Sequence, residues 1–211
     1  MGAADWVRLR TGVVPTAAPV GRRSDRTVLD EAIRPTAAEP PTEVAFTARA
    51  VAAGRHLVEV HDFYRAELAQ VRDVLRQVAQ GAAGVGAARK RVATMTLRSN
   101  AWTLGGLCQG HCRILTDHHT LESQVVFGHL RARQTDLVPV VDRLDAEHEA
   151  IHGVLEEIDS ALIRLAHDPT DLGPVTAALD LLTDTVLSHF AYEERELVGP
   201  LARYGFYPGQ V

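Results

Sequence analysis

The sequence predicts an all-α protein, an antiparallel up-down-up-down four-helix bundle with an irregular N-terminal arm. Three observations support this fold class. Apolar residues recur in alternating steps of three and four along four long stretches, which is the pattern of a helix with one buried face. Aromatic residues make up only 5% of the 211 residues and β-branched runs are few, whereas strands favour both. The stretches are joined by mostly short turns, as antiparallel neighbours in a bundle require.

Residues 1–43 form the predicted arm. They are rich in Pro, Ala, Thr and Arg, and Pro40 is followed directly by Pro41, a pair that cannot continue a helix. We expect this segment to be extended, partly disordered or packed on the body, and we find no chemistry in it. Residues 44–204 are assigned to the bundle and residues 205–211 to a C-terminal tail.

The first two helices are expected over residues 45–80 and 99–132. The apolar seam of the first helix steps by four and three residues in alternation, and the glycine-rich residues 81–86 end it. A basic linker follows. Ser99 and Asn100 are the expected N-cap of the second helix, because their side chains accept hydrogen bonds from the free N–H groups of a first turn.

The last two helices are expected over residues 136–167 and 171–199. Asp136 is the expected N-cap of the third helix, and Pro169 closes it. The Gly199–Pro200 pair is expected to end the fourth helix, because these two residues are the strongest breakers of local structure.

Composition and charge argue against several classes of function. The formal net charge is −5, so no basic excess is present to neutralise phosphates, and nucleic-acid binding is not expected. No stretch approaches the roughly 20 apolar residues of a membrane-spanning helix. The N-terminus has no apolar core of a secretory signal. Two cysteines, Cys108 and Cys112, are too few for a secreted disulfide scaffold, so we expect a cytoplasmic protein.

The predicted seams contain residues that a bundle core normally excludes. A histidine interrupts each seam, and two of these histidines are followed four residues later by a glutamate on the same helix face. A buried carboxylate without a partner costs several kcal/mol or takes up a proton, so these groups need a shared compensating charge. In antiparallel helices the four histidines fall within about 9 Å of depth, at about 1.5 Å per residue. The residues are His61, His118, Glu122, His148, His189 and Glu193.

Two carboxylates and four imidazoles can hold two divalent ions, with each carboxylate bridging both. Bridging carboxylates reduce the repulsion between the ions and hold them a few ångströms apart. Mixed nitrogen and oxygen ligation of this kind suits iron and manganese, and zinc stays open as an alternative. The pattern therefore predicts a two-metal site inside the bundle.

The motifs resemble the hemerythrin-like family, the HHE cation-binding domains. Its four helices supply His, then His-x-x-x-Glu, then His, then His-x-x-x-Glu, and this sequence matches in order over residues 45–200. The matching stretches are HDFYRAEL, HHTLESQVVF, DAEHEAIHGVLEEID and HFAYEERELVGPL. Carried over residue by residue, the resemblance implies that the metal ligands are His61, His118, Glu122, His148, His189 and Glu193.

The oxygen-carrying hemerythrins differ from this pattern at two places. They have His-x-x-x-His on the third helix, and His148 and His152 have that spacing here, so His152 stays open as a fifth imidazole. They also carry a carboxylate five residues after the last histidine, where Glu194 stands. The seam favours Glu193 instead.

Three further residues lie near the predicted ligands in the sequence. His119 is rotated by about 100° from His118, so we expect it to point away from the metal layer, beside the ligands or at the surface. His111 lies two turns before His118, and we expect it to be a polar core residue or a proton relay. Tyr64 lies one turn from His61, and ordinary packing is the simpler interpretation of it. The alternative is a phenol that tunes or protonates a bound oxygen species.

The resemblance implies two iron ions, joined by an oxo or hydroxo bridge, that bind dioxygen, hydrogen peroxide or nitric oxide. Because no reductase domain and no substrate pocket are evident in the 211 residues, we expect binding, sensing or detoxification rather than oxidation of an organic substrate. Two alternatives stay open. One is a di-iron enzyme that decomposes hydrogen peroxide, and the other is a helical partner-binding module with structural metals. The sequence identifies no protein partner.

Overall fold

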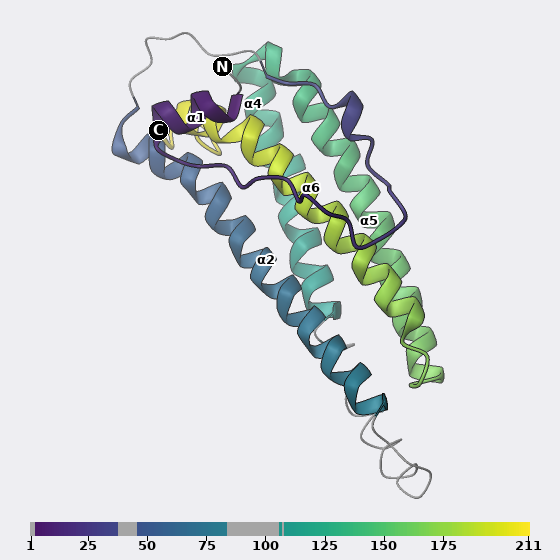
Figure 1. The fold of residues 1–211 in the computed structure, drawn as a ribbon. Helices are drawn as coiled ribbons and strands as arrows, with labels where there is room; N and C mark the ends of the chain where they lie inside the picture. Colours follow the sequence, from purple (N-terminus) through teal and green to yellow (C-terminus); the bar gives the residue numbers. More distant parts are fainter. Residues whose placement is uncertain (1–2, 38–45, 84–105, 107) are drawn as a thin grey trace, which may run out of the picture.

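The computed structural model describes residues 3–37, 46–83, 106 and 108–211 (Figure 1). These residues are largely helical and contain no strand, so the all-α prediction is confirmed for them. Residues 108–121 are α-helical, and a π-helical segment, Glu122–Val126, joins them to α4. The named α-helices are α1 (Ala3–Thr11), α2 (Ala48–Ala83), α4 (Phe127–Arg133), α5 (Val138–His167) and α6 (Gly173–Tyr204).

Four long helical segments lie side by side in Figure 1, namely α2, residues 108–133, α5 and α6. Helix α6 packs against α2, α5, α1 and α4. Because neighbours surround it, nearly every residue of α6 between positions 178 and 202 is buried. Side chains of α6 can therefore meet side chains from several other elements.

The ends of these helices fall within five residues of the predicted ends wherever the structure describes them. The predicted cap at Ser99 and Asn100 lies outside the described residues. The expected stop at Gly199–Pro200 is wrong, because α6 continues through Pro200 to Tyr204. Buried apolar side chains on both sides of Pro200 keep this turn packed. The helix ends instead at Gly205, whose φ of 74° is one that glycine adopts without strain.

The core consists of two apolar clusters with a polar layer between them. One cluster includes Tyr64, Ile151 and Phe190, and the other includes Leu57 and Phe127. On three of the four long segments the seam histidine lies between residues of the two clusters, and on α6 His189 directly precedes Phe190, where the first cluster ends on that helix. The predicted ligands are thus placed inside the bundle, with packed apolar side chains on either side along its length.

The N-terminal arm contains more regular structure than the irregular arm predicted from the sequence. It begins with α1, which the apolar period does not predict. It continues over residues 12–37, here called the strap, which is extended apart from a short 3-10 helix at Glu31–Ile33. In Figure 1 the strap crosses α6, turns, and returns along α5 and α6. It covers the face of α6 that a four-helix bundle alone would expose to solvent.

Within the described residues, no helix combines the length and the apolar character needed to cross a membrane.

Candidate metal centre

Two groups of potential metal ligands converge in the polar layer. In each group the ligand atoms lie within 4.8 Å of one another. The first group combines residues of α2, of the segment 108–126 and of α6, and the second combines residues of the segment 108–121, of α5 and of α6. The first group is His61, His118, Glu122 and Glu193, and the second is His119, His148 and His189.

The two carboxylates of the first group face histidines of both groups. Glu122 lies 3.4 Å from His118 Nε2 through Oε1 and 3.7 Å from His148 Nε2 through Oε2. Glu193 Oε2 lies 3.3 Å from Nε2 of His61 and 3.5 Å from Nε2 of His189. Each carboxylate is therefore positioned between the groups, as a carboxylate that bridges two cations must be.

The outer ring nitrogens of three histidines have polar partners. His61 Nδ1 donates to Glu194 Oε1 at 2.9 Å, and His189 Nδ1 donates to Glu147 Oε2 at 3.1 Å. His148 Nδ1 lies 3.0 Å from the hydroxyl of Ser123. That hydroxyl donates its own proton to Asp145, so it accepts from His148. These partners assign the Nδ1–H tautomer and leave a lone pair on each Nε2, the arrangement that orients metal-binding imidazoles.

Buried acceptor atoms face one another across the layer. The Nε2 atoms of His148 and His189 are 3.1 Å apart, and with both outer nitrogens protonated each presents a lone pair to the other. Several buried acceptor atoms have no hydrogen-bond partner among the described residues, namely Nε2 of His61, His118 and His119, Oε2 of Glu122 and both carboxylate oxygens of Glu193. Such groups are costly unless something satisfies them. Divalent cations would satisfy all of them at once, so the residues fit a metal centre.

Burial and crowding also shift the pKa values of these groups. Burial and the negative charge of Glu193 raise the pKa of Glu122 well above its usual range. Burial alone would raise the pKa of Glu193, but the neighbouring histidines, above all His61, lower it. Burial lowers the pKa of both His118 and His148 to about 3. These imidazoles are therefore neutral at pH 7, the form that binds metal.

The expectation that His119 points away from the layer is wrong. This residue is only 6% exposed, and its ring stacks on His148 with centroids 4.1 Å apart. Its neighbour His118 faces α2 instead and stacks on Tyr64 with centroids 4.8 Å apart. A helix in a bundle presents a face of 100° or more to its neighbours, so two adjacent residues can both point inward.

The other candidates lie outside the two groups. His152 does not reach either group, since its side chain is 57% exposed and its Nε2 lies 3.7 Å from Glu156. The Tyr64 hydroxyl donates to the carbonyl of Ile114 at 3.1 Å, so the structure shows it holding helices together. His111 is buried, with neither ring nitrogen hydrogen-bonded among the described residues. Burial lowers the pKa of His111 to about 4.

Sequence reasoning did not identify the groups that hold the outer nitrogens. Glu147 and Glu194 are both buried, and each is adjacent in sequence to a residue of the metal layer. An acidic residue beside a seam ligand is a signal that could have found them. Arg34, which pairs with Glu147, gave no such signal because it lies in the arm, 113 residues away.

A pocket of about 370 Å³ connects solvent with this layer. It is lined by residues of the segment 108–126 and of α5, including His119, Ser123, His148 and, towards the surface, the exposed His152. Its lining includes both polar and apolar side chains. A small molecule in this pocket would contact the second histidine group.

Comparison with known proteins agrees with the geometry. The model of the hemerythrin HHE cation binding domain matches residues 52–201, which is more than half of the 211-residue chain. Neither the curated proteins nor the solved structures that were compared contain a match. The resemblance drawn from the four histidine motifs is therefore confirmed, and the chain belongs to the hemerythrin HHE cation-binding domain family.

Proposed function

We propose that this protein is a non-haem di-iron protein that binds dioxygen, peroxide or nitric oxide, for binding, sensing or detoxification. Its ligands would be those expected from the sequence, namely His61, His118, Glu122, His148, His189 and Glu193, with His119 as a fifth imidazole. The up-down-up-down antiparallel order of the four helices is part of the proposal. Two iron ions, when bound, supply electrons to a small oxygen or nitrogen ligand.

The observation that carries the proposal is the pair of carboxylates between two groups of histidines. Glu122 and Glu193 each face one histidine of the first group and one of the second. A single-metal site would not need two such carboxylates. The mixture of imidazole and carboxylate donors suits iron or manganese.

The chain itself controls access to this centre. The two apolar clusters exclude water along the bundle, which strengthens electrostatic interactions inside it. The pocket beside His119 and His148 is the route that the described residues offer to a small ligand. Tyr64 holds the ring of His118 by stacking on it, while its own hydroxyl donates a hydrogen bond to the carbonyl of Ile114.

Metal analysis and visible spectroscopy of the purified protein test the proposal. We expect two irons per chain in protein purified from iron-supplied cells, and visible bands that change reversibly when dioxygen is admitted and removed. Glu193→Gln should lose iron because it removes one bridging carboxylate. Glu59→Gln is the matched control, since Glu59 is an exposed glutamate of α2 that pairs with the exposed His56.

Other outcomes distinguish the alternatives. Protein that stays metal-free although iron is supplied throughout would refute the proposal. Rapid release of oxygen from added hydrogen peroxide would favour the peroxide-decomposing enzyme. Unfolding on chelation, without any spectral response to dioxygen, peroxide or nitric oxide, would favour a structural metal in a partner-binding module.

A further inference from the structure

The strap forms hydrogen bonds to buried acidic side chains along α6 and α5. On its outward path, the backbone N–H of Thr16 donates to Glu194, and those of Arg23 and Ser24 donate to Asp184. On its return, side chains of the strap reach α5, and the backbone N–H of Ala37 donates to a carboxylate of α6, Glu196. The strap is therefore attached at many points to the helices that carry the candidate ligands.

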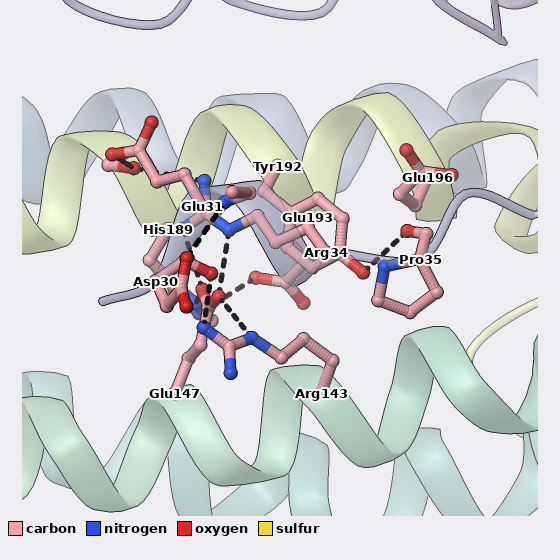
Figure 2. Close-up of polar contacts among 12 residues, drawn as sticks. Asp30, Glu31, Arg34, Pro35, Arg143, Glu147, His189, Tyr192, Glu193 and Glu196 are labelled. Atoms are coloured by element: carbon pink, nitrogen blue, oxygen red, sulfur yellow. Dashed lines mark hydrogen bonds and ion pairs between the residues drawn. The ribbon is translucent and has the colours of Figure 1, made fainter.

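Arg34 extends a charged side chain from the strap to buried groups of α5 and α6. Its Nε and Nη2 donate to the two oxygens of Glu147 at 2.7 and 2.8 Å, and its Nη1 donates to Ser188 at 3.0 Å. The side chains of Arg34 and Glu147 are only 5% and 1% exposed. Figure 2 shows Arg34, Glu147 and His189 gathered in one cluster between α5 and α6, with dashed lines for the polar contacts among them.

Glu147 connects this arginine to the metal layer. Its Oε2 accepts a hydrogen bond from His189 Nδ1 at 3.1 Å. A second arginine, Arg143, donates to Glu147 Oε1 at 3.0 Å and also to the carbonyl of Asp30 in the strap (Figure 2). Glu147 is thus held from two sides, and its orientation decides where the ring of His189 points.

The strap also reaches the first ligand group. Thr16 N–H donates to Glu194 Oε2 at 2.7 Å, while Glu194 Oε1 accepts from His61 Nδ1 at 2.9 Å. Arg65 of α2 donates to the same carboxylate at 2.7 Å. One outer partner in each ligand group is therefore in contact with the strap.

We propose that Arg34 is a positioning residue of the metal centre, which acts through Glu147 to keep Nε2 of His189 directed into the second histidine group. This inference rests on the proposed function, because it assigns a role toward the metal. It gives the N-terminal arm a part in the site, although the arm contributes no ligand. The planar guanidinium suits this role, since its two parallel hydrogen bonds fix a carboxylate in one orientation.

The test compares Arg34→Met with Arg26→Met in the full-length chain. Arg26 also lies in the strap and also makes two hydrogen bonds to a glutamate of α5, Glu157, at 2.6 and 2.9 Å. That pair is exposed at the surface, and the partners of Arg26 in the described part of the chain, Glu157 and Ser24, are not candidate ligands. The control thus removes a similar arm-to-helix ion pair without touching the chain of contacts to His189.

Anaerobic titration with Co²⁺ gives both the affinities and the visible bands, which report ligand number and geometry. For Arg34→Met we expect one of the two ions to bind 10- to 100-fold more weakly, the usual effect of losing an outer partner, and its bands to change. The other ion should keep its affinity. Arg26→Met should match the wild type in both affinities and in its spectrum.

Arg34→Lys separates position from charge. It keeps a positive charge beside Glu147 but cannot make two parallel hydrogen bonds, so we expect a loss between those of the wild type and Arg34→Met. If the circular dichroism spectrum of Arg34→Met differs from that of the wild type, the Co²⁺ affinities and visible bands of Arg34→Lys decide the test. Wild-type affinities and bands in every folded Arg34 variant would overturn this inference alone. A wild-type protein that binds fewer than two ions would overturn the proposed function and this inference together.

Discussion

His118 and His119 are adjacent in sequence, yet they contact different helices. His118 stacks on Tyr64 of α2, and His119 stacks on His148 of α5. One helical turn thus contributes two imidazoles to the layer, His118 to the first group and His119 to the second. The spacing His148-x-x-x-His152 offered another fifth imidazole, but that histidine is exposed.

Single substitutions at His119 and His152 should differ in their effect on metal content. His119→Ala should lose one of two bound ions, because it removes a buried donor from the second group. His152→Ala should keep both ions, because its ring is exposed and contacts Glu156. Metal content after gel filtration, with circular dichroism to check folding, measures the difference. Loss of metal only in His152→Ala would contradict the assignment.

At the scale of elements, α2 and α6 approach each other closely at one position. Gly54 of α2 lies against α6, where an added Cβ would be 2.6 Å from the backbone oxygen of Val198. The π-helical segment Glu122–Val126 is the second irregular feature, and it begins at Glu122, one of the two candidate bridging carboxylates. Such single-turn segments often occur at functional sites, because they change the direction of one side chain within a regular helix.

The close approach at Gly54 predicts the outcome of two glycine substitutions. Gly54→Ala should lower the free energy of unfolding by about 1–3 kcal/mol, because the new methyl group forces α2 and α6 apart. Gly153→Ala in α5, where a Cβ would meet no atom within 4 Å, should raise it by up to about 1 kcal/mol, because alanine favours helix. Urea unfolding of the metal-free proteins measures both. Equal effects would show that α2 and α6 adjust freely at this contact.

At the scale of the whole molecule, burial of the polar layer links stability to pH. The pKa of His111 falls to about 4 and those of His118 and His148 to about 3 in the folded chain, mainly because burial disfavours their charged form. Between pH 6.5 and those values the unfolded chain binds more protons than the folded chain. Stability therefore rises with pH across this window and is lost on acidification.

Three other buried groups, Glu147, Glu122 and His61, act in pH windows that differ from that of the neutral histidines. Glu147, whose pKa is lowered to about 2 by hydrogen bonds from His189 and Arg34 against the effect of burial, contributes stability above its usual pKa that is lost in acid. Glu122 has a raised pKa and opposes this trend above its usual value of 4.5. The raised pKa of His61 gives stability that is lost only as the pH rises above 6.5. The groups that favour stability at neutral pH outnumber those that oppose it.

We accordingly expect the metal-free protein to lose stability steadily as the pH falls from 6.5 to 4. His111→Leu should flatten this dependence, since it removes one buried histidine whose contribution is on the order of 2–3 kcal/mol at pH 4. It lies outside both ligand groups, so metal binding should be retained. Urea unfolding at several pH values, for both proteins, provides the measurement. An unchanged slope in His111→Leu would contradict the burial of a neutral imidazole at this position.

Much of this protein is determined by its sequence alone. The period of the apolar residues predicts four helices whose ends fall within five residues of the observed ends in the described parts of the chain. The same period identifies histidines at similar depth, and the structure brings His61, His118, His148 and His189 into one layer. This works because each helix is rigid, with a fixed rise and turn per residue, so the spacing of residues along it fixes their depth and face.

Only the tertiary structure decides what surrounds that layer. The inward direction of His119 depends on which two helices flank its own, and the sequence period does not specify this. The burial of Asp184, Ser188 and Glu196 on α6 depends on the strap, whose extended path has no period to read. The contact of Arg34 with Glu147 spans 113 residues and arises from packing alone. Local geometry is repeated along a helix, whereas contacts between distant segments exist only once the chain has folded.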